Sequence, residues 1–185
     1  MGKKVFGFIG AIWGVFGVSA FLAWAVFRLT PYMLEIFYLE LQWYHWLLLV
    51  LNVVFMAYTE GYKGFQQGAA PRLGARVRYL YQNPTVLHVI FSPFFCSSYF
   101  HTTRRRLIAR YILTSMIILL IVVVSHFQQP WRGIIDAGVL IGLAWGLVAI
   151  LYQSIKALWA DEFHCSPELP ESTAVVLIKE TEPQI

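Results

Sequence analysis

The sequence predicts an all-α integral membrane protein with four transmembrane helices, arranged as two antiparallel hairpins with both termini in the cytoplasm. Three observations support this fold class. Only 13% of the 185 residues are charged, against roughly 25% in a soluble domain of this size. Four apolar segments are long enough to cross the hydrocarbon core, which takes roughly 20 helical residues. Most Lys and Arg residues lie between the second and third of these segments.

Short links join the first span to the second and the third to the fourth, so each pair should form antiparallel neighbours. Pro130 lies in the second link, where it cannot continue a helix. Together the spans form one expected transmembrane domain over residues 1–159. The spans are residues 5–27, 37–58, 107–127 and 133–159.

The distribution of basic residues predicts the orientation. Loop 59–106 carries seven Lys and Arg residues, whereas each short link carries one, and residues 61–135 contain no acid. Basic loops stay on the cytoplasmic side of a membrane. We therefore expect a bacterial inner-membrane protein with both termini inside. Residues 160–185 are acidic and rich in proline, and we expect them to form a mobile cytoplasmic tail.

Loop 59–106 is expected to lie on the membrane surface. Gly61 is interpreted as the cap that ends the second span. Residues 71–82 place apolar side chains on one helical face with arginines beside it, which is typical of an interfacial amphipathic helix. Six arginines are expected to contact anionic headgroups: Arg72, Arg76, Arg78, Arg104, Arg105 and Arg106.

The apolar segment 85–100 within this loop is interrupted by Pro93 and is too short to span easily. If it did span, the arginines on its two sides would fall on opposite faces of the membrane, against the charge rule. We therefore interpret it as re-entrant or interfacial. The alternative is an N-terminal extension of the third span.

Polar side chains recur along one face of the second span. A stripe of this kind is costly against lipid and is expected to face other helices or a water-filled cavity. A packed seam of interhelical hydrogen bonds is the simpler interpretation, and an ion path or ligand site is the alternative. The seam consists of Gln42, His45, Asn52, Thr59 and Glu60.

Glycines mark two faces for close helix packing, because a residue without a side chain lets two backbones approach. Packing inside the bundle is the simpler interpretation, and a dimer seam is the alternative. The two faces are Gly7, Gly10, Gly14 and Gly17 on the first span, and Gly138, Gly142 and Gly146 on the fourth.

Three ionisable residues are predicted at similar depth near the outer membrane face. His45, His126 and Asp136 could converge there into one polar cluster. The simpler alternative for Asp136 is a pair with Arg132 one turn away. For His45 the simpler alternative is a hydrogen-bonded core histidine.

Catalytic patterns are not evident, and we expect neither a cofactor nor a metal. The hexapeptide from Leu41 to Trp46 locally resembles the start of the first haem-bearing helix in di-haem b-type cytochromes. That resemblance would imply haem, but axial ligation requires facing histidines in mid-membrane. The first and fourth spans contain no histidine. Phosphate-binding loops, hydrolase elbows and HExxH motifs are also missing from the sequence.

These features favour a non-enzymatic accessory or assembly subunit that acts by helix–helix and membrane-surface association. Its expected partners are anionic lipids together with another protein or a second copy, and nucleic acid is not expected. The first alternative is a small oligomeric transporter or channel that uses the polar seam of the second span. The second alternative is a membrane enzyme acting on redox carriers or lipids.

Overall fold

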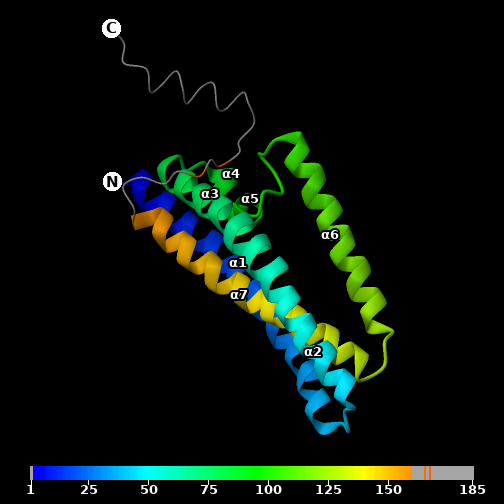
Figure 1. Ribbon diagram of the computed structural model, residues 1–185. Helices are drawn as coiled ribbons and strands as arrows, with labels where there is room; N and C mark the ends of the chain where they lie inside the picture. The colour runs from blue at the N-terminus through cyan, green and yellow to red at the C-terminus, as the bar shows by residue number, and fades with distance from the viewer. Residues whose placement is uncertain (1, 160–164, 166, 168–185) are drawn as a thin grey trace.

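The computed structural model describes residues 2–159, 165 and 167, and the predicted tail 160–185 otherwise lies outside this range. The regular structure of the described residues is entirely helical and contains no strand. Three helical stretches are long and apolar enough to cross a membrane: Gly2–Tyr38, Arg104–Ser125 and Trp131–Trp159. The all-helical class is therefore confirmed, and the three stretches indicate an integral membrane protein (Figure 1).

Helix α1 spans Gly2–Glu35 and continues into a short 3₁₀ turn, η1, at Ile36–Tyr38. The predicted end at residue 27 is wrong, because the helix continues through Pro31. A proline inside a membrane helix is tolerated where neighbouring groups compensate for the missing hydrogen bond. Here the end of α1 packs against the start of the last helix, which buries Ile36 completely.

The second predicted span, residues 37–58, overlaps only the first part of a much longer helix, which begins at Trp43. Helix α2 (Trp43–Met56) passes without a break into the π-helix η2 (Ala57–Ala69) and then into α3 (Ala70–Gln82). Residues at both junctions keep right-handed helical backbone angles. The prediction of a loop starting at residue 59 is therefore wrong. Gly61 does not cap the second span, because the helix continues through it. Its backbone instead packs against Trp145 of the last helix.

Helix α3 is part of the protein core. Its face contains Leu73, Val77 and Leu80, and these side chains are buried against α1 and the last helix. The predicted helix over residues 71–82 is present, but its apolar side faces protein. The physical reason is its continuity with α2 through η2, which carries it along α7 and beside α1 (Figure 1).

Two short helices follow, α4 (Val86–Ile90) and α5 (Ser92–Cys96), and both pack against α1. Ser98 and His101 adopt positive φ angles of 63° and 51°. L-residues rarely adopt this conformation, which interrupts a helix. Segment 85–100 is therefore not an extension of the next helix, and the alternative of one long third helix is wrong.

The last two helices, α6 (Arg104–Ser125) and α7 (Trp131–Trp159), agree closely with the predicted third and fourth spans. They are not packed together as predicted. Buried residues make up 44% of the most apolar stretch of α7 but only 6% of that of α6. Helix α6 has neither glycine nor alanine after residue 109, so it offers no surface for close approach.

Helix α7 is the centre of the fold. It packs along α1 on one side and along α2, η2 and α3 on the other. Figure 1 shows the start of α1 and the end of α7 at one end of the molecule, beside α3, α4 and α5, with α6 standing apart. The shared core lies at this end and draws its residues from α1, α3, α4, α5 and α7.

Candidate intramembrane interaction site

The glycine face of α7 lies directly against α2 and η2. A Cβ atom built on Gly138 would meet the Asn52 side chain and the Met56 side chain at 2.9 Å. At Gly142 the nearest atom would be Cβ of Glu60, at 3.0 Å. Glycine at these positions therefore sets the close approach of the two helices.

This contact makes Gly138 sensitive to size. Gly138→Leu is expected to lower the free energy of unfolding by about 1–3 kcal/mol, because the added atoms overlap Asn52 and Met56. Val148→Leu on the same helix is a matched control, since Val148 is exposed. Thermal unfolding of both variants in the same detergent measures the difference, and equal midpoints would contradict the close contact.

The glycine face of α1 has a different partner, the segment from α3 to α5. Gly7 lies against the Tyr81 backbone, Gly10 against Val89, and Gly14 against Ser92 and Cys96. The Ser92 hydroxyl also donates a hydrogen bond to the Gly10 carbonyl at 2.7 Å. Both glycine faces thus make contacts inside this chain.

Most of the predicted polar seam on α2 forms hydrogen bonds within the chain. Asn52 Nδ2 donates to the Ile134 carbonyl at 2.7 Å. His45 Nδ1 accepts from the Gln42 backbone N–H at 3.1 Å, which caps the start of α2. The Thr59 hydroxyl donates to the Phe55 carbonyl at 2.8 Å. Glu60 is the exception, with an exposed side chain.

The residues predicted to converge near the outer face have separate partners. His45 packs its ring against Trp131, with ring centres 5.3 Å apart. Asp136 pairs with Arg132 at 3.6 Å. His126 is exposed at the end of α6, with Nδ1 2.7 Å from the Val122 carbonyl. The structure therefore joins Asp136 to its neighbour on α7 and leaves the two histidines apart.

The end of the bundle where α1 ends and α7 begins holds a different polar cluster, centred on Tyr32 of α1. The Arg132 guanidinium lies over the Tyr32 ring, 3.6 Å from its centre. Gln129 donates to the Tyr32 carbonyl at 3.1 Å and to Glu35 at 2.9 Å. These contacts tie the start of α7 to the end of α1.

Helix η2 carries an exposed set of polar residues that the sequence analysis did not single out together. We call this set the η2 face; it consists of Glu60, Lys63, Gln66 and Gln67. Lys63 Nζ lies over the Tyr58 ring at 4.9 Å. Within the described chain, no ion pair joins Lys63 to Glu60. A π-helix is rare and occurs often at functional sites. The presence of these exposed polar residues on a π-helix therefore makes η2 a candidate functional segment.

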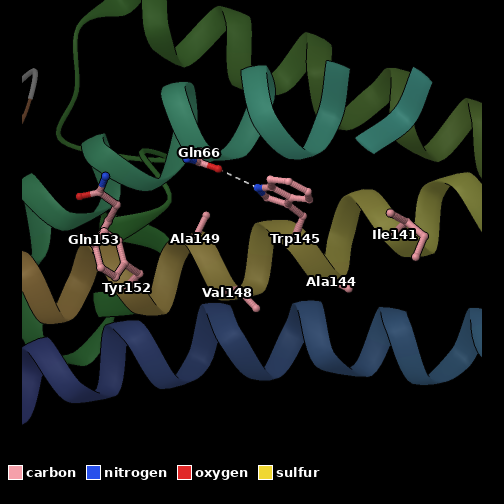
Figure 2. Close-up of a pocket in the computed structure, with 8 residues that line it drawn as sticks. All are labelled: Gln66, Ile141, Ala144, Trp145, Val148, Ala149, Tyr152 and Gln153. Atoms are coloured by element: carbon pink, nitrogen blue, oxygen red, sulfur yellow. Dashed lines mark hydrogen bonds between the residues drawn. The ribbon is translucent and has the colours of Figure 1, made fainter. Parts of the chain in front are cut away.

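A groove adjoins the η2 face. It has a volume of about 590 Å³, and α7 supplies all of its lining except Gln66. Trp145 Nε1 donates to Gln66 Oε1 at 2.8 Å across the groove. Figure 2 shows this bond linking α7 to the helix above it, while Val148 and Ala144 point toward α1. The other lining residues are Ile141, Ala149, Tyr152 and Gln153.

Arg76 on α3 is buried instead of facing lipid. Its side chain is only 1% exposed. The guanidinium donates to the carbonyls of Phe95 at 2.8 Å, Phe100 at 3.3 Å and His101 at 3.1 Å. It also lies 4.9 Å from the centre of the Phe95 ring. The prediction of lipid contact is therefore wrong for Arg76, because the turn after α5 needs donors for its carbonyls.

Two histidines, His88 and His101, lie beside Arg76. The His88 ring lies 4.5 Å from that of Phe95 and 4.8 Å from that of His101. Burial lowers the pKa of His88, and electrostatic interactions with His101 and Arg76 lower it further. Burial and then Arg76 likewise lower the pKa of His101. Both rings are therefore held neutral at physiological pH.

This neutrality predicts a dependence of stability on pH. The folded-state pKa of His88 lies below its usual value of 6.5. Its contribution to the free energy of unfolding is therefore complete above pH 6.5 and is lost as the pH falls through the folded pKa. We expect the unfolding midpoint to fall between pH 7.5 and 5.5, and to fall less in His88→Phe. Identical falls in thermal scans would show that His88 is not responsible.

Cys96 lies next to this cluster, and its surroundings make it unreactive. It is 1% exposed, and its Sγ lies 3.8 Å from the Ser92 hydroxyl. Burial raises the pKa of the thiol to about 12. Because the thiolate is the reactive form of cysteine, Cys96 is unsuited to nucleophilic or redox chemistry.

The described residues bring together no group of histidine, cysteine and acidic side chains that could hold a metal ion. Comparisons of the chain with protein families, with curated proteins and with solved structures found no match. The features available for a functional argument are therefore the membrane class and the η2 face with its groove.

Proposed function

We propose that this multi-pass membrane protein acts by association, with the η2 face and the adjoining groove as its contact surface for another membrane protein. The observation that carries the proposal is the exposure of charged and amide side chains on η2, far from either end of the bundle. This fits an accessory or assembly subunit better than an enzyme.

The depth of the η2 face follows from its contacts with α7. Glu60 lies against Gly142 and Phe65 against Gly146. At 1.5 Å per residue, these glycines lie about 17 and 23 Å from the start of a helix that is about 43 Å long. The hydrocarbon core is about 30 Å thick. The η2 face therefore lies near the middle of the bilayer if α7 crosses it.

Exposure to lipid at this depth is costly. A charged side chain at the centre of a membrane helix costs about 2.5–3.5 kcal/mol. Glu60 and Lys63 together would then offset a large part of the 5–15 kcal/mol that typically stabilises a protein. A partner helix that brings its own hydrogen-bonding groups, and that seats in the groove beside Gln66, removes this cost.

The proposed orientation places both termini in the cytoplasm of a bacterial inner membrane. The charge rule supports this orientation, and so does the fold, because the start of α1 and the end of α7 lie at the same end as α3. A fourth crossing would combine the end of α2 with η2, so that the η2 face lies within it. A topology reporter inserted after Asn83, an exposed residue between α3 and α4, should be active on the cytoplasmic side. Activity outside would contradict the arrangement.

Photo-cross-linking tests the contact surface. A photoreactive residue at Lys63 or Gln67 should give a discrete protein adduct in intact cells. The same residue at Val54 or Leu51, which are exposed on the apolar surface of α2, should give mainly lipid adducts. Equal protein adducts from both helices, or none from η2, would contradict the proposal.

A small oligomeric channel or transporter is the second candidate. It is favoured by the exposure of Glu60 and Lys63 without an ion pair between them in the described chain, since several copies could line a water-filled path with these residues. Ion flux in proteoliposomes that is lost in Glu60→Gln would support this candidate. Flux equal to that of empty liposomes would leave the association proposal in place.

A further inference from the structure

A second groove lies on the segment between α4 and α6, away from the η2 face. It has a volume of about 500 Å³, and its exposed surface is entirely apolar. Leu87 and Phe94 are 61% and 57% exposed. A peptide would find no hydrogen-bonding group on these walls, whereas a hydrocarbon chain needs none. The lining residues are Leu87, Phe91, Phe94, Tyr99 and Phe100.

Tyr99 places this groove at a defined position along α6. Its hydroxyl lies 2.7 Å from Thr114 Oγ1, and its ring contacts Tyr111 at 6.1 Å between centres. Thr114 is ten residues after Arg104, which is about 15 Å along the helix. Half of the 30 Å hydrocarbon core is also about 15 Å. The distance from the first turn of α6 to the groove therefore matches the depth of one leaflet.

The first turn of α6 carries the complementary charge. Arg104 and Arg105 are exposed, and neither has a hydrogen bond or ion pair among the described residues. The neighbouring sequence contains no acid from residue 61 to residue 135. Arginine near a membrane surface attracts anionic headgroups and can bind a phosphate with two parallel hydrogen bonds.

We propose that one anionic diacyl phospholipid binds here, with its phosphate on Arg104 and Arg105 and one acyl chain along the groove lined by Phe94 and Leu87. Such a lipid would join the first turn of α6, through its phosphate, to α4 and α5, through its acyl chain. This site is separate from the proposed contact surface on η2, so either can fail without the other.

Native mass spectrometry of the full chain tests the site. At limiting lipid, the protein should retain one phosphatidylglycerol in preference to phosphatidylcholine. The double variant Arg104→Gln/Arg105→Gln should weaken phosphatidylglycerol retention by about 30-fold, at about a kcal/mol per arginine. Lys3→Gln/Lys4→Gln removes two exposed charges near the same membrane face and should have little effect. Equal loss in both double variants, or no preference between the lipids, would overturn the proposal.

Two further arms test the acyl chain. Leu87→Trp should fill the groove and reduce phosphatidylglycerol retention at least fivefold, whereas Leu51→Trp on α2 should leave it unchanged. Both positions are exposed, so the fold should tolerate tryptophan. Soluble glycerol phosphate should not compete with the lipid. Competition by glycerol phosphate, or unchanged retention in Leu87→Trp, would show that the groove holds no acyl chain.

Discussion

Arg76→Met is expected to lower the free energy of unfolding by about 3–5 kcal/mol. The substitution removes the guanidinium that donates to the carbonyls of Phe95, Phe100 and His101. Hydrogen bonds to charged groups contribute about 1.5–3 kcal/mol each, and buried carbonyls left without donors add a cost of their own. Because these bonds fix the turn between α5 and α6, we also expect α6 to lose its position.

The control is Lys156→Met, which removes an exposed basic residue from the last turn of α7 and should change stability by less than about 0.5 kcal/mol. Arg76→Lys should recover less than half of the loss, since one ammonium group cannot reproduce the planar fork of arginine. Unfolding followed by circular dichroism in the same detergent measures all three variants. A stability of Arg76→Met equal to that of Lys156→Met would show that the buried guanidinium does not hold the turn.

The double variant Glu60→Gln/Lys63→Met should have opposite effects on association and on stability. Protein adducts from a photoreactive residue at Gln67 should decrease at least tenfold, because the η2 face no longer offers the partner its two charged groups. The isolated chain should become more stable in lipid bilayers, because two side chains that cost about 2.5–3.5 kcal/mol each at this depth become neutral.

These opposite effects on association and stability distinguish a contact surface from a structural role of Glu60 and Lys63. If Glu60 and Lys63 only supported the fold, their replacement would lower both stability and association. The control variant is Lys156→Met, which removes one exposed lysine from the last turn of α7 and should alter neither property. Reduced stability of the Glu60→Gln/Lys63→Met variant in bilayers would contradict the proposed role.

Local signals in the sequence predicted the helical class, the bounds of α6 and α7, and the two glycine faces as places of close approach. They failed over residues 59–70, which were expected to form a loop, and they did not predict that the helix over residues 71–82 packs against protein. Glycine and proline usually mark turns and loops, and this stretch contains Gly61, Gly64, Gly68 and Pro71. In the structure they lie within one continuous helix, because the packing of η2 and α3 on α7 outweighs their low helix propensity.

Charge counting also could not distinguish one arginine from another. Arg76 lies three residues after Leu73 and four before Leu80, so it shares the buried face of α3 with them. That spacing was visible in the sequence, but the donors that the turn at Phe95 requires were not. The partners of the α1 glycine face were equally hidden, since Val89 and Ser92 reach it only through the fold of α4 and α5.

The depth of η2 is the central claim, and a spin label at Gln67 measures it most directly. In bilayers, collision rates of the label with oxygen and with a water-soluble nickel complex report its distance from the headgroups. The account predicts a depth near that of a label at Val148 on α7, well inside the hydrocarbon core. A label at the depth of the headgroups would contradict it.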